Sequence, residues 1–411
     1  GLVGDSTYLT IKNCYSVGAV TVNGGYVGGL LGDYYGTIMT GCYYDGVASE
    51  YMPVKAVDIG KLTSGMKAKS TFSGWDFTAK WNIDEGSSYP YLRNIAVPEG
   101  VRVGLPINEV ASGTGTAVDP YIISTKEQLN NMKYDLSGSY KLANDIDLQG
   151  MEWTPVGNGG IHFTGTFDGN GYTISNLNIN KPTLDYMGLF GCTTNATIKN
   201  LTINNATVQG RNYVGALVGV TTTSTVQNCS VTGTSAVNGT SYLGGLIGQA
   251  TGKVEKSFTV ANVTGTGSRI GGLIGYCTTM QMTESYATGK VTGVSYIGGL
   301  VGVAGDGSAR PTIEDCFALG DVKSTGTGYL YTAGLVGDST YLTIKNCYSV
   351  GAVTANGGYV GGLLGYNYGT SVTNSYFNST TSGFTTPAAN ARTTSELKQQ
   401  ATFTTWDFLI K

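Results

Sequence analysis

The chain has 411 residues and a net charge of −3, and charged residues make up only 12% of it, about half the usual share. Lysine and arginine are scattered, so we expect no nucleic acid partner, and no apolar run reaches the roughly 18 residues of a membrane span. Hydrophobic residues, at 41%, exclude a disordered chain. The 63 glycines, with abundant Thr, Ser, Asn and Tyr, favour many short strands joined by tight turns.

The start of the chain recurs far downstream. Residues 1–32 match residues 334–365 at every position except Val22, which is Ala355 in the second copy. The match then weakens but persists, and Trp75-Asp76-Phe77 recurs as Trp406-Asp407-Phe408. We therefore predict three parts: residues 1–95 as the C-terminal part of a preceding module, residues 96–115 as a linker, and residues 116–411 as a nearly complete second module. On this interpretation the chain is one part of a longer array of tandem modules.

Short helices are expected at the ends of each module. The segment Ser124 to Tyr134 begins with Ser and Thr and carries Glu127, which is typical of a helix N-terminus. It should open the second module and cover its first coil. The segments near Leu62–Ser70 and Thr394–Gln400 are expected to cap the opposite ends, where stacked strands would otherwise expose open sheet edges.

A Gly-Leu-apolar-Gly string, with Ala in place of the first Gly in one copy, repeats through the second module. Its leucines lie 27 to 35 positions apart, at Leu189, Leu217, Leu246, Leu273, Leu300, Leu335 and Leu363. About twelve residues after most of them comes a small residue, Ser or Cys. The long interval contains Ala304 to Pro311, which indicates a loop inserted into one coil.

Each unit thus contains about three short strands in roughly 28 residues, too few to bury a face alone. Stacked on copies of itself, the unit forms three parallel sheets around a narrow core. The sequence therefore predicts an all-β fold, a right-handed parallel β-helix of three-strand coils with short helical caps. An α-solenoid lacks support because the units have no apolar i, i+3, i+4 stripes. A propeller would need longer blades.

The recurring string resembles the GLUG repeat family. The start of the second module adds to the resemblance, with Asn144-Asp145-Ile146-Asp147-Leu148 and Phe167-Asp168-Gly169-Asn170-Gly171, and the likeness covers roughly residues 111–411 and 1–92. It implies a secreted or cell-surface bacterial β-helix protein. Some family members are attached to metallopeptidases that cleave immunoglobulin A, but their HExxH zinc motif cannot exist in a chain whose one histidine is His162.

A file of aromatic residues is the first candidate site. Four positions before the motif leucine stand Tyr213, Tyr242, Tyr296, Tyr331 and Tyr359, with Arg269 in the place of Tyr in one coil and Tyr26 as the copy in the first module. Stacked coils should align these rings along one face. Sugars dock on exposed aromatic rings, so the file is a possible ligand-facing surface. The alternative, which we favour, is that the rings stack on one another and cover the Gly-rich corner.

The sequence context of the other candidate residues favours structural roles for them. Asp145, Asp147 and Asp168 could serve glycoside hydrolysis or calcium binding, but they sit in an entry strand and a turn. Cys14, Cys229, Cys316 and Cys347 occupy the small-residue file, where Ser also occurs, so buried thiols are expected rather than nucleophiles or disulfides, although Cys316 and Cys347 lie on successive coils. His162 should be a surface or turn residue. We predict no catalytic residue, no metal site and no cofactor.

These observations favour a non-catalytic extracellular structural or adhesive module that assembles end to end into fibres or a surface layer. Its partners would be neighbouring modules of the same protein, and it would lie at the bacterial cell surface or be secreted, without inserting into a membrane. One alternative is a β-helix that binds or degrades polysaccharide and contacts cell-surface glycan. Another is a structural segment of a larger surface peptidase.

Overall fold

The computed structural model describes residues 2–17, 20, 28–46, 60–83, 89–92, 111–307, 310–387, 390–403 and 406. The chain forms two compact units, residues 1–139 with 159–162 and residues 140–158 with 163–411. We call them the first and the second unit and describe each by itself. Most of the predicted linker lies outside the described residues, so the module boundaries stay a prediction. Tyr26, the predicted copy of the tyrosine file in the first module, also lies outside them.

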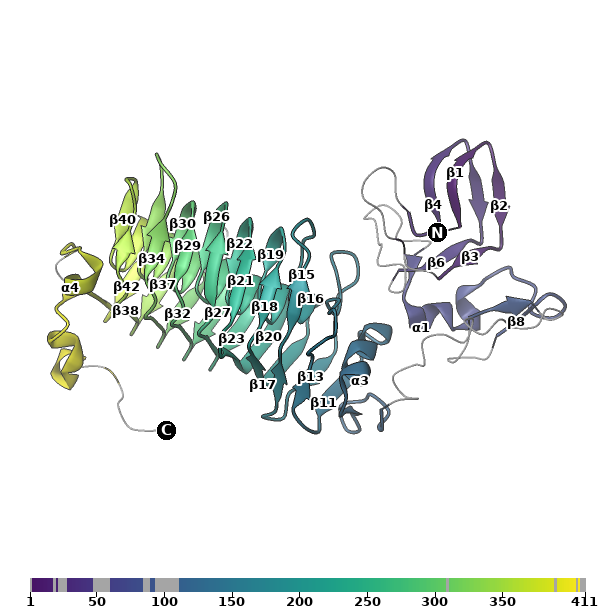
Figure 1. Ribbon diagram of the computed structural model, residues 1–411, viewed down its shortest axis with the longest axis horizontal. Helices are drawn as coiled ribbons and strands as arrows, with labels where there is room; N and C mark the ends of the chain where they lie inside the picture. The colour runs from purple at the N-terminus through teal and green to yellow at the C-terminus, as the bar shows by residue number, and fades with distance from the viewer. Residues whose placement is uncertain are drawn as a thin grey trace. The chain divides into compact units, whose positions relative to one another are not determined.

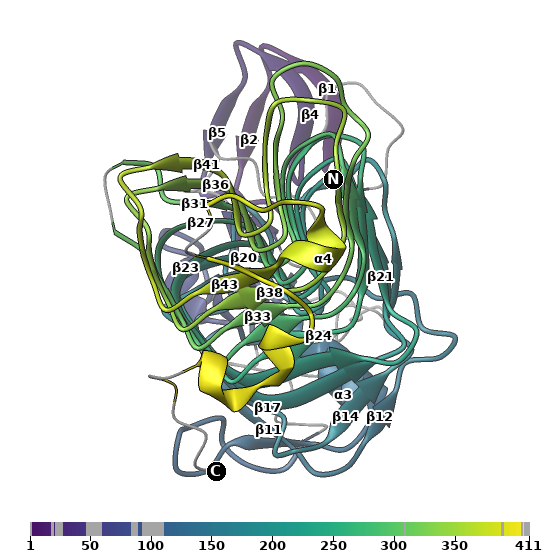
Figure 2. The same ribbon diagram turned by 90° about the vertical axis from the view of Figure 1, so that its left-hand side faces the viewer.

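The second unit is a parallel β-solenoid, as the repeat predicts, and Figures 1 and 2 show its strands stacked coil upon coil. The first of its three sheets contains β15 (Asn178–Asn180), β18 (Thr207–Gln209), β21 (Ala236–Gly239), β25 (Asn262–Gly265), β29 (Val291–Gly293), β34 (Val322–Ser324) and β39 (Val353–Thr354). The second contains β19 (Asn212–Val214), β22 (Ser241–Gly244), β26 (Ser268–Gly271), β30 (Ser295–Gly298), β35 (Tyr331–Ala333) and β40 (Tyr359–Gly361).

The third sheet is the largest because each coil contributes more than one segment to it. It begins, within this unit, with β11 (Ser139–Leu142), β12 (Ile146–Asp147), β13 (Thr166–Asp168), β14 (Thr173–Ser175), β16 (Phe190–Thr194), β17 (Thr197–Asn204), β20 (Val218–Thr232), β23 (Ile247–Glu255), β24 (Phe258–Thr259), β27 (Ile274–Thr283) and β28 (Tyr286–Ala287). It continues with β31 (Val301–Ala304), β32 (Thr312–Glu314), β33 (Phe317–Ala318), β36 (Val336–Thr340), β37 (Thr343–Lys345), β38 (Tyr348–Ser349), β41 (Leu364–Tyr368), β42 (Ser371–Thr373), β43 (Tyr376–Asn378) and β44 (Ala391–Arg392).

Equal positions of successive repeats stack on one another. Ile247 pairs with Ile274, and Ile274 pairs in turn with Val301. The seven motif leucines are at most 4% exposed, and fully burying one Leu side chain stabilises a fold by about 1.5–3 kcal/mol. The inserted loop leaves this register intact, since Cys277 pairs with Ala304 before it and Gln281 with Thr312 after it.

Two different steric contacts require glycine at the first and at the last position of the Gly-Leu-apolar-Gly string. A Cβ at Gly272 would overlap the carbonyl oxygen of Gly299, its counterpart in the next coil. A Cβ at Gly248 would lie 2.7 Å from the carbonyl carbon of Tyr213, a residue of the preceding coil with a left-handed φ of +57°. The first glycine therefore lets adjacent coils approach closely, and the second makes room for the left-handed backbone of the coil before it.

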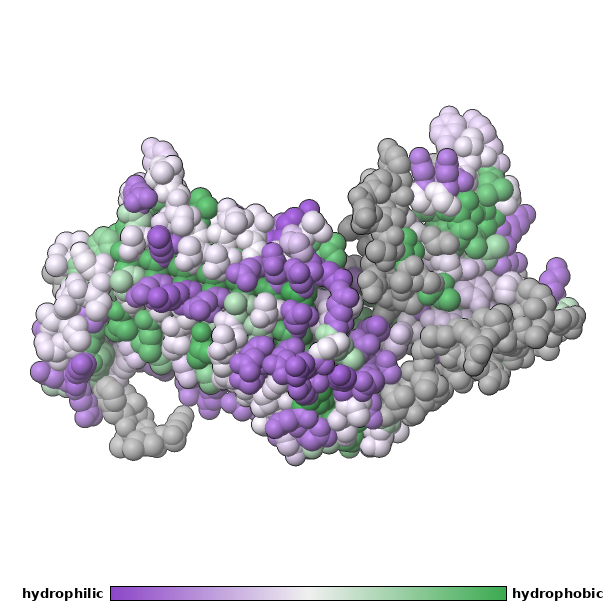
Figure 3. All heavy atoms as spheres, viewed as in Figure 1, coloured by the Kyte–Doolittle hydropathy of each residue, from purple (hydrophilic) through white to green (hydrophobic). Residues whose placement is uncertain are grey.

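The first unit begins with two coils of the same kind as those of the second unit. They comprise β1 (Val3–Thr7), β2 (Thr10–Lys12), β3 (Tyr15–Ser16), β4 (Leu31–Tyr35), β5 (Ile38–Thr40) and β6 (Tyr43–Asp45), followed by β7 (Gly60–Lys61), β8 (Trp81–Asn82) and β9 (Tyr91–Leu92). Strand β1 pairs with β4 through Val3 and Leu31, the same register that joins Val336 to Leu364 in the second unit. On the face shown in Figure 3, a patch of apolar residues lies on the first unit, and on the second unit a band of apolar residues runs beside hydrophilic ones.

Short helices occur in all three segments where caps are predicted. Helix α3 (Lys126–Asn131) has Thr125 as its N-cap, and a capping box joins Thr125 to Gln128, one residue beyond Glu127. It follows β10 (Tyr121–Ile123) and leads into the 3₁₀ turn η2 (Met132–Tyr134). The other caps are α1 (Thr63–Met66) with η1 (Lys69–Thr71) and, in the second unit, η3 (Glu396–Lys398) with η4 (Gln400–Thr402), after the short helix α4 (Ser379–Ser382).

Candidate functional site

The predicted tyrosine file forms a continuous ladder on the second unit. It begins one coil earlier than predicted, at Tyr186, whose ring centroid lies 5.1 Å from that of Tyr213, and the next step to Tyr242 is 4.5 Å. Arg269 then places its guanidinium over Tyr242 and Tyr296, 4.9 and 5.5 Å from the ring centroids. The ladder continues through Tyr331 to Tyr359, with centroid distances of 4.7 and 5.4 Å.

Stacking determines what this ladder offers a ligand. The faces of Tyr213 lie against those of Tyr186 and Tyr242, and burial, followed by the neighbouring Tyr242 and Tyr186, raises the pKa of the Tyr213 hydroxyl. The ladder therefore presents mainly ring edges and hydroxyls, while sugars dock on ring faces. Only Tyr359, at the end, is more than a third exposed, at 47%. The ligand-facing role stays a prediction, and the geometry favours the structural alternative.

A second aromatic ladder, which the sequence reasoning missed, lies in the third sheet. Phe258, Tyr286, Phe317 and Tyr348 stack with centroid distances of 4.6, 4.5 and 5.0 Å. Each follows directly after a residue of the small Ser and Cys file, so the same repeat contained the signal. The ladder ends on the cap, where Trp406 packs against Tyr348 at 5.9 Å and donates a hydrogen bond from Nε1 to the Asn374 carbonyl.

The small-residue file satisfies backbone groups at a corner. The amide of Cys229 donates to Ser257 Oγ at 3.1 Å, and the amide of Ser257 donates to Ser285 Oγ at 3.2 Å. All seven cysteines are free thiols. Burial raises the pKa of Cys229 to about 12, so its thiol is protonated at neutral pH and is not a nucleophile. His162, the one histidine of the chain, is half-buried in an irregular segment just before Phe163.

The three predicted aspartates hold turns. Asp145 Oδ1 accepts from the Thr173 amide at 2.8 Å, and Asp147 Oδ1 accepts from the Gln149 amide at 2.9 Å. Asp168 Oδ1 accepts from the Asn170 amide and from Asn200 Nδ2, at 2.8 and 3.0 Å. Burial acts to raise the pKa of Asp168, but these hydrogen bonds and Lys199 outweigh it and lower the pKa. A carboxylate held in its charged form this way suits a turn better than a general acid.

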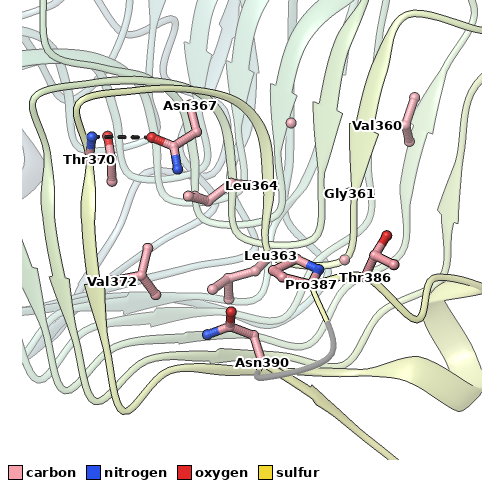
Figure 4. A pocket seen from close by; sticks show the side chains of 12 residues that line it. Val360, Gly361, Leu363, Leu364, Asn367, Thr370, Val372, Thr386, Pro387 and Asn390 are labelled. Carbon is pink, nitrogen blue, oxygen red and sulfur yellow. Dashed lines mark hydrogen bonds between the residues drawn. The ribbon is translucent and has the colours of Figure 1, made fainter.

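A cavity of about 580 Å³ lies at the C-terminal end of the solenoid. Figure 4 shows Leu363, Leu364 and Val372 on one side, and Thr386, Pro387 and Asn390 from the following segment. Its lining includes no Asp, Glu, His, Lys, Arg or Cys. The described lining therefore offers the hydroxyls of Thr370 and Thr386 without a neighbouring ionisable side chain that could act as their general base.

Two further features are absent from the described part of the chain, a cluster of metal-binding side chains and a membrane-spanning helix. No three His, Cys, Asp or Glu side chains come together there in a way that could hold a metal ion. No helix among these residues is long and apolar enough to cross a membrane.

Comparison with known proteins agrees with the fold. Residues 119–233 match the N-terminal region of the M26 IgA1-specific metallo-endopeptidases, and residues 293–323 and 356–382 match the GLUG motif. Halomucin of Haloquadratum walsbyi is 36% identical over 74% of this chain, and an immunoglobulin A1 protease of Streptococcus pneumoniae is 27% identical over 53%. The chain spans only 4% and 14% of the lengths of these two relatives.

A crystal structure of a putative immunoglobulin A1 protease from Bacteroides ovatus has a similar fold. Its TM-score is 0.53 at 23% identity, and the alignment covers 64% of this chain and 86% of that one. At this level of identity the likeness concerns the fold alone. The chain is thus a β-solenoid that contains GLUG motifs at residues 293–323 and 356–382, and its residues 119–233 are similar to the N-terminal region of the IgA1-specific metallo-endopeptidases.

Proposed function

We propose that this chain is a non-catalytic structural segment of a larger extracellular surface protein, which spaces or presents other parts of that protein. The observation that carries the proposal is the composition of its interior and ladders. Leucines, glycines, stacked rings and hydroxyls repeat from coil to coil. The predicted aspartates accept structural hydrogen bonds, and Cys229, Cys316 and Cys347 are buried. The small share of each relative's length that the chain covers supports a segment rather than a whole enzyme.

Surface shaving of intact producing cells tests this proposal. Trypsin added to whole cells should release peptides of this chain into the medium, where mass spectrometry identifies them, while a cytoplasmic marker protein stays inside. Recovery of these peptides only after lysis would contradict the proposal. The purified chain should also leave immunoglobulin A1 and polysaccharides uncleaved, and cleavage abolished by Asp168→Asn would replace the structural role with an enzymatic one.

We also propose that the segment assembles end to end. Among the described residues, β41 pairs only with β36 and β42 only with β37, so both strands have an open edge that another strand could extend. Electron microscopy of the purified chain at high concentration should show filaments that lengthen with concentration. Monodisperse short particles at every concentration would contradict assembly.

A further inference from the structure

Two pairs of tyrosines lie at equivalent corners of the repeat, one pair in each unit. We call them the first and the second tip pair. In the first tip pair, Tyr8 and Tyr35 lie edge to face with centroids 5.4 Å apart and planes at 82°. In the second tip pair, Tyr341 and Tyr368 lie 5.3 Å apart at 69°. Each pair is joined by a backbone hydrogen bond of 2.8 Å, from the Tyr8 amide to the Tyr35 carbonyl and from the Tyr341 amide to the Tyr368 carbonyl.

The turn at this corner does not require tyrosine. Tyr8 and Tyr341 lie six positions after the motif leucine and have a left-handed φ of +51°. Asn195 and Thr223 hold the same position in other coils with φ of +52° and +48°. Because Asn adopts this conformation more readily than a bulky residue, tyrosine at this corner calls for a reason other than the turn.

The chain makes room for these rings in both units. A Cβ at Gly36 would lie 2.5 Å from the Tyr8 ring, and one at Gly369 would lie 2.5 Å from the Tyr341 ring. Both glycines have left-handed φ, at +61° and +65°. The sequence around them differs, since Asp33-Tyr34 is replaced by Tyr366-Asn367, while Tyr-Gly-Thr is kept.

The tip pairs differ from the stacked ladder in what they expose. Tyr35 is 66% exposed and Tyr368 is 54% exposed, and a perpendicular arrangement covers fewer ring faces than parallel stacking. Arg310 lies over the ring of Tyr341, 5.3 Å from its centroid, so Tyr368 is the more open ring of the second pair. In the first pair Tyr8 is also open, at 74% exposed.

The size and charge of these surfaces identify the class of ligand. Two tyrosine rings offer far less than the roughly 800 Å² that each partner buries in a stable protein interface, but they suit one or two sugar rings. Asp33 stands near the first pair and Arg310 over the second, so the pairs share no charge. Thr37 and Thr370, beside the two glycines, already hydrogen-bond within the chain, to Ser6 and to the Leu342 amide, so what the pairs share is their open ring faces.

We propose that the tip pairs are binding sites for neutral saccharides, with sugar C–H groups on the open faces of Tyr35 and Tyr368. The proposal is independent of whether the chain is a structural segment.

Affinity electrophoresis of the full chain tests the proposal. The gels contain hydroxyethyl cellulose, galactomannan or xyloglucan, and retardation gives a dissociation constant for each polymer. Wild type should be retarded by at least one of them. Tyr35→Ala with Tyr368→Ala should raise the dissociation constant at least tenfold, and Tyr35→Phe with Tyr368→Phe, which keeps both rings, should change it less than threefold.

The matched control is Tyr329→Ala, which removes a single tyrosine that is 85% exposed and should leave retardation unchanged. Circular dichroism confirms that each variant keeps its strands. Absence of retardation of wild type in all three polymers would overturn the proposal. So would unchanged retardation of the double Ala variant, or loss of retardation in Tyr359→Ala, which would assign the binding to the stacked ladder.

Discussion

Residues 2–32 and 335–365 have the same sequence apart from one position, yet they are buried to different extents. Leu335 is fully buried, whereas Leu2 is 40% exposed, and Leu342 is 1% exposed against 41% for Leu9. In the second unit, β36 lies between β31 and β41, while β1 pairs only with β4 among the described residues. The comparison teaches that a residue of this solenoid obtains its burial from the coil before it as much as from its own sequence.

The caps provide the sharpest test of this comparison. Trp75 is 7% exposed and packs on Phe72 and Trp81 with centroid distances of 4.8 and 4.4 Å. Its counterpart Trp406 is half-buried. We expect Trp75→Ala to destabilise the first unit by about 3–5 kcal/mol, and Trp406→Ala to destabilise the second by less than about 3 kcal/mol. Hydrogen exchange of β4–β6 and β41–β43, measured by mass spectrometry, separates the units, and equal effects would contradict the difference in burial.

The motif leucines should show the next largest contrast. Leu335→Ala removes a side chain with 0% exposure and should cost about 2–5 kcal/mol in free energy of unfolding. Leu2→Ala changes the same position in a 40% exposed setting and should cost less than about 1 kcal/mol. Urea denaturation followed by hydrogen exchange measures both. A large effect of Leu2→Ala would mean that another part of the chain covers the first coil.

The second glycine of the string, Gly337 in the second unit and Gly4 in the first, allows a matched pair of substitutions in which a side chain is added and none is removed. A Cβ at Gly337 would lie 2.6 Å from the backbone nitrogen of Ile297, whereas a Cβ at Gly4 would meet nothing within 4 Å. Gly337→Ala should therefore destabilise the second unit by about 1–3 kcal/mol, while Gly4→Ala should change stability by less than about 0.5 kcal/mol. Similar thermal melting curves for the two variants would show that the close approach is not needed.

Thiol labelling gives the smallest expected effect. Cys14 is partly exposed, and its counterpart Cys347 is fully buried. Burial, followed by the nearby Cys42, raises the pKa of Cys14, so its thiolate becomes abundant only above the ordinary thiol range, and its labelling rate should keep rising there with pH. N-ethylmaleimide should modify Cys14 in the native protein while Cys347 stays protected. Peptide mass spectrometry reports both, and equal labelling would contradict the burial difference.

The core of the fold follows from the period of the sequence. Leu246 and Leu273 recur at one position of a fixed repeat, and stacking equal positions is the one arrangement that buries them all. The second ladder could have been found in the same way, because Phe258 and Tyr286 each follow a serine of the small-residue file. The Gly-Leu-apolar-Gly string does not itself point to this ladder, because its rings lie 12 to 17 positions after the motif leucine.

The candidate site was predictable only in part. The positions of Tyr213 and Tyr242 predict the stacking that is observed. They do not predict how much of each ring face is covered, because a left-handed φ accompanies stacked rings at Tyr213 and an edge-to-face pair at Tyr341. The tip pairs carry even less signal, since Tyr341 stands where other coils have Asn, Thr or Gly. At α3, sequence pointed to Glu127, but the capping box uses Gln128 because the N-cap is Thr125 rather than Ser124.

The close approach of Gly272 to Gly299 has a consequence for the length of the solenoid. Contacts of this kind join one position of a repeat to the same position of the next, so removal of one whole coil brings equivalent residues together again. The fold itself therefore sets no fixed number of coils, and a chain with one coil fewer should keep the same three sheets.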